Sequence, residues 1–177
     1  MERVLIIGCG GAGKSRLARQ LAAMTGLPVI HLDAEFWQPG WMEPDRALWR
    51  ERVRGLSRDR YWIIDGNYGG TLEQRLADAD TVFFLDFPTL TCVYGIFERL
   101  IRFHGRTRPD MTPGCPERVT WEFFLYVLNF RRHSRWRILD ALKGFKGELV
   151  TLGSRHAVNR YVRSLQEESV ESPALSP

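Results

Sequence analysis

The feature that most constrains this chain is a glycine-rich turn near its N-terminus, Gly8-Cys9-Gly10-Gly11-Ala12-Gly13-Lys14-Ser15. It has the spacing G-x-x-x-x-G-K-S, which is typical of phosphate-binding loops, or P-loops. An apolar run over Arg3 to Ile7 precedes the turn, and apolar residues at helical spacing follow from Gly13 to Met24. In this strand-to-helix context the glycines turn backbone N–H groups toward phosphates, and the helix start adds a positive dipole end. The sequence therefore predicts nucleotide binding at this turn.

The polar residues of the motif have distinct expected roles. Lys14 is expected to reach the terminal phosphates, and the Ser15 hydroxyl is expected to bind Mg²⁺. The chain lacks the Asn-Lys-x-Asp sequence that typifies guanine-specific P-loop proteins, so ATP is the expected nucleotide rather than GTP. The expected nucleotide-binding residues are Gly8, Gly10, Gly11, Ala12, Gly13, Lys14, Ser15, Arg16, Arg99 and Arg102.

Four further short apolar runs, each bounded by Gly, Asp or Pro, alternate with helix-like segments. They cover Pro28 to Leu32, Tyr61 to Ile64, Thr81 to Leu85 and Glu148 to Leu152. This alternation predicts an α/β fold of the P-loop NTPase type, a five-stranded parallel sheet between two layers of helices, with ligands at the carboxyl ends of the strands. We expect one domain over residues 1–166. Residues 167–177 are rich in Ser, Pro and Glu and are expected to be a disordered tail.

Three aspartates follow predicted strands and are candidates for the site. Asp33 would lie beside the P-loop, where it could hold an acceptor group or act as general base. Asp65 could orient Mg²⁺. Asp86 follows the Thr81 to Leu85 run, the pattern of a second nucleotide-motif strand whose aspartate contacts the metal through water. Pro88 marks a turn there, so capping a turn or helix is the favoured role for this residue.

Arginine dominates the basic residues, with 22 arginines against three lysines. Its planar fork matches phosphate oxygens two at a time, although base composition or a solvated basic face would also explain many of these arginines. Residues 99–137 are expected to form an inserted lid, with a Gly/Pro-rich loop over 105–116 and an aromatic-rich helix over about 117–130 whose rings pack as lid core. Seven lid arginines are candidates for contacting a polyphosphate: Arg99, Arg102, Arg106, Arg108, Arg131, Arg132 and Arg135. The expected catalytic residues are Lys14, Asp33, Arg106 and Arg108.

The composition narrows the setting of the protein. No stretch approaches the roughly 20 apolar residues of a membrane span, and the N-terminus has no signal-peptide pattern, so we expect a cytoplasmic protein. Cys9, Cys92 and Cys115 have no paired spacing and are expected to be reduced. The sequence leaves monomer and homodimer open.

Beyond the P-loop, several segments resemble the DNA topology modulation proteins, a family of P-loop kinases related to adenylate kinase. The resemblance covers nearly the whole chain and rests on His31-Leu32-Asp33, Phe36-Trp37, Pro39-Gly40-Trp41, Trp62 to Tyr68, Gly105 to Met111 and Pro113 to Arg118. It implies a nucleoside-kinase-like fold with ATP in the P-loop and a lid around Arg108. The family's name suggests an influence on DNA topology, which these residues do not explain.

The chain departs from adenylate kinase where that family binds its acceptor. Asp65-Gly66-Asn67-Tyr68-Gly69 stands in place of an Asp-Gly-Phe-Pro-Arg sequence, so the acceptor-binding arginine is missing. No arginine follows Asp33; the aromatic residues Phe36, Trp37 and Trp41 follow instead. These rings could line a pocket for a less charged acceptor or cover the sheet edge. AMP is therefore not the expected acceptor.

Three functions remain open on the sequence. The favoured one is an ATP- and Mg²⁺-dependent kinase for a small molecule, such as a nucleoside, nucleotide or hydroxyl metabolite. The second is an ATP-binding regulator that contacts DNA, which the modest net charge of +4 and the lack of a helix-turn-helix pattern disfavour. The third is a nucleotide switch or ATPase without an acceptor.

Overall fold

The computed structural model describes residues 1–171, and they contain a five-stranded sheet in which every strand pairing is parallel. The strands lie in the order β2-β3-β1-β4-β5. Their bounds are β1 Arg3–Gly8, β2 Val29–His31, β3 Trp62–Asp65, β4 Thr81–Leu85 and β5 Glu148–Leu152. The predicted parallel sheet is confirmed, and each strand lies within one or two residues of its predicted bounds.

The three central strands carry the core. All residues of β3 and β4, and β1 from Val4 onward, are buried. Strands buried on both faces read as continuous apolar runs, because side chains pointing either way meet a helix layer. This explains why the runs in the sequence located the strands without alternation.

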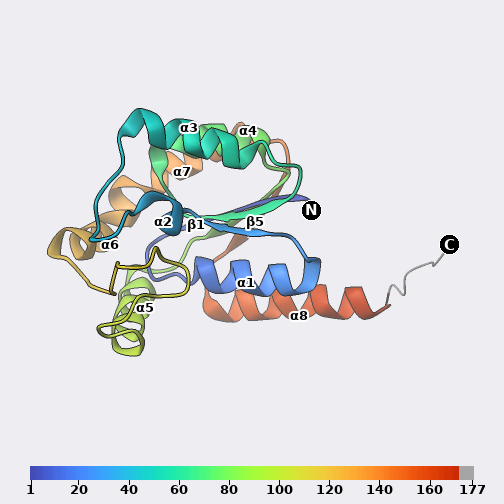
Figure 1. The fold of residues 1–177 in the computed structure, drawn as a ribbon. Coiled ribbons are helices and arrows are strands. Elements are labelled where there is room, and N and C mark those ends of the chain that lie inside the picture. Colours follow the sequence, from blue (N-terminus) through green and yellow to red (C-terminus); the bar gives the residue numbers. More distant parts are fainter. Residues whose placement is uncertain (172–177) are drawn as a thin grey trace.

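Helices cover both faces of the sheet (Figure 1). One layer contains α1 (Lys14–Thr25) and α8 (Arg155–Glu171), and the other contains α3 (Arg46–Ser57), α4 (Leu72–Asp78) and α7 (Arg135–Leu142). The short helices α2 (Leu32–Phe36) and η1 (Gly69–Thr71) follow β2 and β3. The predicted three-layer α/β architecture is therefore confirmed.

Two longer helices, α5 (Thr89–Arg102) and α6 (Trp121–His133), flank the carboxyl ends of the strands (Figure 1). The chain between them, residues 103–120, has no helix, and its ends are joined by bridges between His104 and Glu117 and between Thr107 and Pro116. The aromatic helix begins at Trp121 rather than near residue 117, because the Thr120 side chain accepts a hydrogen bond from the Phe123 N–H and caps it. We call residues 103–120 the lid loop.

The C-terminal end differs from its predicted boundary. Helix α8 continues to Glu171, so residues 167–171 of the expected tail are helical, and residues 172–177 lie outside the described residues. None of the described helices combines the length and apolar character needed to cross a membrane. The three cysteines are free thiols, and all three are buried.

Candidate functional site

The P-loop has the backbone shape that its glycines predict. Gly11 and Gly13 have φ values of 79° and 90°, in the left-handed region that residues with a Cβ avoid. Gly13 is the N-cap of α1, and Lys14 is the first residue of that helix. The first N–H groups of a helix have no acceptor within it and face the end of the helix, where a phosphate fits. The loop is thus formed as a phosphate cradle.

Helix α5 packs directly on the back of this loop. A Cβ built on Gly11 would lie 2.1 Å from the Cys92 carbonyl oxygen, and one built on Gly95 would lie 2.1 Å from the Gly11 carbonyl oxygen. A Cβ on Gly10 would lie 2.7 Å from the Phe123 ring of α6. At these three glycines, the P-loop therefore packs against α5 and α6 with no room for an additional methyl group.

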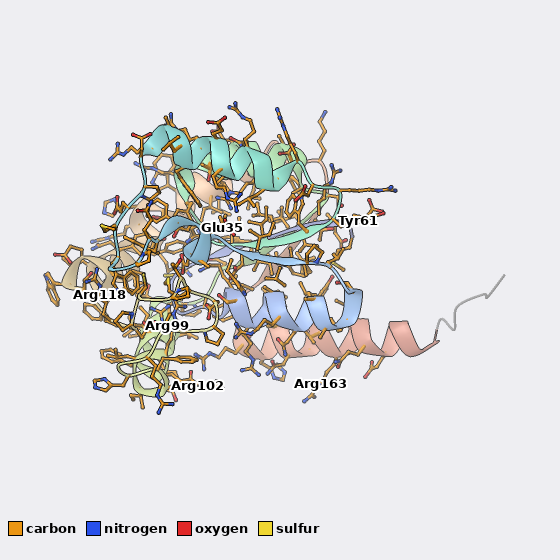
Figure 2. All side chains as sticks on the ribbon, viewed as in Figure 1. Glu35, Tyr61, Arg99, Arg102, Arg118 and Arg163 are labelled. Carbon is orange, nitrogen blue, oxygen red and sulfur yellow. The ribbon has the colours of Figure 1, made fainter. Side chains whose placement is uncertain are left out.

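A cavity of about 1570 Å³ lies in front of the P-loop. Its wall includes the P-loop, the carboxyl ends of β2 and β3, helix α5 and the lid loop. Most residues expected at the site line this cavity: Gly10, Gly11, Ala12, Gly13, Lys14, Ser15, Arg16, Asp33, Asp65, Arg99, Arg102 and Arg108. Arg99, Arg102 and Arg118 line the cavity, and in Figure 2 they lie at the end of the molecule formed by α5 and α6, whereas Tyr61 and Arg163 lie toward the opposite end.

Two expected residues lie outside the cavity wall. The Gly8 N–H donates to Asn67 Oδ1 at 2.8 Å, and Asn67 Nδ2 donates to the Gly8 carbonyl oxygen at 2.5 Å. Gly8 therefore joins the P-loop to the loop after β3 rather than facing a ligand. Arg106 is exposed on the lid loop and does not line the cavity, so its predicted catalytic role has no support from its position.

Asp33, on α2, is held by two other segments. The Tyr68 hydroxyl donates to Asp33 Oδ1 at 2.8 Å, and Arg108 Nη2 lies 3.6 Å from Asp33 Oδ2. Burial and the adjacent carboxylate raise the pKa of Tyr68, so its phenol stays a donor. The Asp33 side chain is still 44% exposed. The carboxylate is oriented and remains open to the cavity.

Arg108 is the centre of an ion-pair network in the lid loop. Its Nε lies 2.7 Å from Glu117 Oε2, and its Nη1 donates to Asp110 Oδ2 at 2.9 Å. Arg99 Nε donates to Glu117 Oε1 at 2.9 Å. The network joins α5 to the lid loop and to Asp33. Both arginines line the cavity as expected, yet their guanidinium groups contact carboxylates, and a direct contact with phosphate stays a prediction.

The lid loop also places a carboxylate next to the P-loop. Burial raises the pKa of Asp110, but the Arg108 charge and a hydrogen bond from Ser15 outweigh it, and the pKa is lowered overall. Arg19 Nη1 lies 3.7 Å from Asp110 Oδ1. An ionised carboxylate therefore lies beside the hydroxyl that the motif assigns to Mg²⁺.

Asp65, the last residue of β3, is buried and forms a short contact of 2.6 Å between its Oδ1 and His31 Nδ1. Burial lowers the pKa of His31, but the hydrogen bond and charge of Asp65, together with the charge of Asp110, raise it above its ordinary value of 6.5 overall. The described residues contain no group of three or more His, Cys, Asp or Glu side chains placed to hold a metal ion. Mg²⁺ in phosphate-transferring sites takes few protein ligands besides phosphate and water. Ser15, Asp65 and Asp110 offer the oxygen donors that such a site uses.

The His31–Asp65 pair gives a pH-dependent stability. A raised histidine pKa means that the contribution of the pair is fully present below pH 6.5 and is lost as the pH rises through the folded-state pKa. We expect His31→Gln to lower the free energy of unfolding more at about pH 5.5 than at about pH 9, measured by denaturant titration. His104→Gln, at an exposed position of the lid loop, is the control and should show no such difference. Equal losses from His31→Gln at both pH values would contradict the assignment.

Asp86 and the arginines after α6 form a separate cluster. Arg135 Nη2 donates to Asp86 Oδ2 at 2.7 Å, and Arg131 Nη1 donates to Asp86 Oδ1 at 3.4 Å. The favoured turn or helix-cap role is not what Asp86 does here, since the carboxylate anchors α6 and α7 to the end of β4. Arg131, Arg132 and Arg135 do not line the cavity, so the position of these three residues does not support polyphosphate binding.

The loop after β3 is shaped by a buried arginine on α4. Arg75 is 0% exposed, and its guanidinium donates to the carbonyl oxygens of Gly66, Asn67, Tyr68 and Thr71. Among the described residues, no carboxylate lies within ion-pair distance of it, and burial lowers the pKa of Arg75 to about 9. These bonds hold the loop that presents Asn67 to the P-loop and Tyr68 to Asp33.

The aromatic residues near α2 divide between core and cavity. Phe36, Trp49 and Tyr68 pack together, with ring centroids 4.9–5.1 Å apart, and Trp49 is buried. Trp37 and Trp41 line the cavity, with centroids 5.3 Å apart. Phe36 therefore packs against the core, whereas Trp37 and Trp41 are placed to line a pocket, and binding of a less charged acceptor there stays a prediction.

Comparison with known proteins agrees with this architecture. The chain matches no protein-family model, and no curated protein matches its sequence. Among solved structures, a shikimate kinase from Acinetobacter baumannii in complex with shikimate has a TM-score of 0.59 at 13% identity, covering 97% of this chain and 94% of that one. A gluconokinase from Sinorhizobium meliloti has a TM-score of 0.55 at 15% identity, with coverages of 96% and 92%.

A third similar structure is a deoxyadenosine kinase from M. mycoides with bound dATP, with a TM-score of 0.52 at 13% identity, covering 97% of this chain and 100% of that one. The fold is that of the P-loop kinases. At these identities the similarity establishes the fold, and the DNA topology modulation family is not among the findings. The roles of individual residues are therefore argued from their positions in this chain.

Sequence reasoning missed four residues that shape the site: Asn67, Tyr68, Arg75 and Asp110. Asn67, Tyr68 and Asp110 line the cavity, but each acts through a partner far away in the chain. Arg75 lies in a helix with no motif around it. The run Asp65 to Tyr68 after a buried strand was the only local signal for the first two.

Proposed function

We propose that this chain is an ATP- and Mg²⁺-dependent kinase that transfers a phosphoryl group to a hydroxyl of a small molecule. One observation carries the proposal: the P-loop cradle and the oriented, open carboxylate of Asp33 face the same cavity. Phosphoryl transfer depends on positioning and on stabilising charge, and both elements serve this. The cavity volume of about 1570 Å³ has room for a nucleotide and an acceptor together.

In this proposal, residues at one end of the cavity bind the nucleotide and residues at the other end bind the acceptor. When bound, Mg·ATP would supply the phosphoryl group and a cation that neutralises its charge. Lys14 would hold the terminal phosphates, and Ser15 with Asp65 or Asp110 would hold the cation. Asp33 accepts the proton of the attacking hydroxyl, and the Tyr68 hydroxyl holds that carboxylate in place. The lid loop excludes water from the transfer.

The acceptor end favours a compound with a ring and a hydroxyl group. Trp37 and Trp41 supply apolar faces beside Asp33, and Arg118 lies over the Trp41 ring at 4.7 Å. Arg108, the arginine next to Asp33, already faces three carboxylates. Arg108 is therefore not free to bind a monophosphate next to Asp33, which supports a hydroxyl compound other than AMP.

The test is ATP consumption by the purified protein with Mg²⁺ across nucleosides, sugars, other hydroxyl metabolites and nucleotides, with Lys14→Ala as the background. One acceptor should raise turnover far above that background. If ATP binds and no acceptor raises turnover, the kinase proposal fails and a nucleotide switch or DNA-binding regulator becomes the better explanation. DNA binding by such a regulator would weaken steeply with salt.

Asp33→Asn tests the acceptor end separately. We expect kcat to fall by roughly 10²–10⁴-fold while ATP affinity changes little, because the general base is lost and the P-loop is untouched. The measurements are steady-state kinetics with the identified acceptor and ATP binding by calorimetry. Asp59→Asn, at an exposed position before β3, is the matched control. A kcat within a few-fold of the wild-type value would remove Asp33 from the base role.

A further inference from the structure

Helix α5 carries an apolar stripe on its outer face. Leu90, Tyr94, Phe97 and Ile101 are 82%, 63%, 47% and 79% exposed. The steps between them are four, three and four residues, so they lie on one side of the helix. A surface helix normally presents polar side chains to water on its outer face. The stripe has the spacing of a helix that packs against another helix.

The stripe continues onto α6. The Phe97 and Phe124 rings are 6.4 Å apart, and the Trp121 ring stacks on Phe124 at 5.6 Å. Trp121 is 67% exposed, so the prediction that it packs in the lid core is wrong. Leu128, 41% exposed, lies on the same side of α6 as Phe124. We call Leu90, Tyr94, Phe97, Ile101, Trp121 and Leu128 the α5–α6 apolar surface.

We propose that a second copy of this chain covers the α5–α6 apolar surface and forms a two-fold symmetric dimer. The spacing of the stripe reads the same in both directions along α5. An antiparallel copy of the helix therefore places Leu90 opposite Ile101 and Tyr94 opposite Phe97, and both ends of the contact are identical. A two-fold dimer requires such self-complementarity.

The apolar area of this surface fits coverage by a second copy of the chain. Taking roughly 150–250 Å² for each large side chain, the exposed fractions leave about 570–950 Å² of apolar area, a range that includes the roughly 800 Å² that each partner buries in a standard interface. Isolated apolar patches on monomers are typically about 300–600 Å². The surface is thus large enough for a stable dimer.

The charges next to Tyr94 are paired within the chain. Glu98 pairs with Arg155 at 2.9 Å, and the Arg155 guanidinium lies 5.4 Å from the centre of the Tyr94 ring. Neither of these two ions therefore has to lose water without a partner when Tyr94 is covered. The proposal is independent of the kinase activity, since it concerns the protein without nucleotide.

The first measurement is the molar mass of the full chain by light scattering after gel filtration. We expect twice the 20.5 kDa of the chain. The protein is loaded up to about 100 µM, at which even a dimer with a Kd of about 10 µM is mostly associated. A monomeric mass at that concentration overturns the proposal, whether or not the monomer binds anionic lipid vesicles or another protein.

Charge substitutions then test the register. Leu90→Lys and Ile101→Glu, each alone, should give monomers, because each places a charge against an apolar side chain of the other copy. The double substitution should restore the dimer, because the antiparallel arrangement places the two opposite charges together. Both positions are at least 79% exposed, so folding should be unchanged, which circular dichroism checks.

Leu48→Glu is the matched control, since Leu48 is 65% exposed on α3, in the helix layer away from α1 and α8. It should leave the dimer intact. A dimer that persists in both single variants overturns the proposal, because its interface then lies elsewhere. Failure of the double variant to reassociate overturns the antiparallel pairing on which the proposal rests.

Discussion

Replacing Lys14 by alanine is expected to lower kcat/KM for phosphoryl transfer by on the order of 10²–10³-fold, about 3–4 kcal/mol of transition-state stabilisation. The reason is the role proposed for Lys14, as the P-loop cation that would reach the phosphates on which charge develops. Within residues 1–171, Lys14 Nζ donates only to the Cys9 carbonyl oxygen, at 3.1 Å, so its loss should cost little stability. The measurement is steady-state kinetics with the acceptor that the panel identifies.

Lys143→Ala is the control for this prediction. The Lys143 side chain is 77% exposed, pairs with Asp140 on α7 and does not line the cavity, so removing it takes away a positive charge outside the cavity wall. Its kinetics should match the wild type. A Lys14→Ala protein that folds normally and retains wild-type kcat/KM would show that the P-loop does not perform the transfer.

The second large effect concerns Gly95, in the middle of α5. Gly95→Ala places a methyl group 2.1 Å from the Gly11 carbonyl oxygen, and neither atom belongs to a flexible side chain. We expect a loss of roughly 2–3 kcal/mol in the free energy of unfolding, in the range of overpacked cores. ATP affinity should fall as well, because the displaced atoms belong to the P-loop. Denaturant titration and calorimetry measure the two effects.

Gly55→Ala is the matched control for Gly95→Ala. Gly55 also lies inside a helix, α3, but nothing lies within 4 Å of a Cβ built there. Alanine should therefore stabilise the protein by about 0.5–1 kcal/mol through helix propensity. Destabilisation of similar size at both positions would mean that close packing against the P-loop is not the cause.

Much of this fold follows from local patterns in the sequence. The P-loop spacing located the first strand, turn and helix, and buried parallel strands read as apolar runs whose ends agree with the structure. Helix boundaries were less certain because they depend on capping. Thr120 begins α6 later than the aromatic pattern suggested, since one hydroxyl bond to the Phe123 N–H decides the position.

The candidate site was predicted only in part, because its contacts join distant segments. Gly8 and Asn67 are 59 residues apart, and Asp33 and Tyr68 are 35 apart. No periodicity or spacing encodes such pairs. The lid arginines show the same limit: residue type suggested phosphate binding for Arg108 and Arg135, whereas the fold places carboxylates against both. Which partner an arginine meets is decided by tertiary packing.

The buried guanidinium of Arg75 has a consequence for how this protein can be altered. It holds the loop after β3 through main-chain oxygens, so these hydrogen bonds do not depend on which side chains the loop carries. The Tyr68 carbonyl oxygen accepts a hydrogen bond from Arg75, while the Tyr68 hydroxyl donates one to Asp33. At Tyr68, the main chain therefore contributes to the shape of the loop and the side-chain hydroxyl contributes to the orientation of Asp33. Tyr68→Phe would therefore remove the hydroxyl from Asp33 while keeping the main-chain hydrogen bond to Arg75 and the ring packing against Phe36 and Trp49.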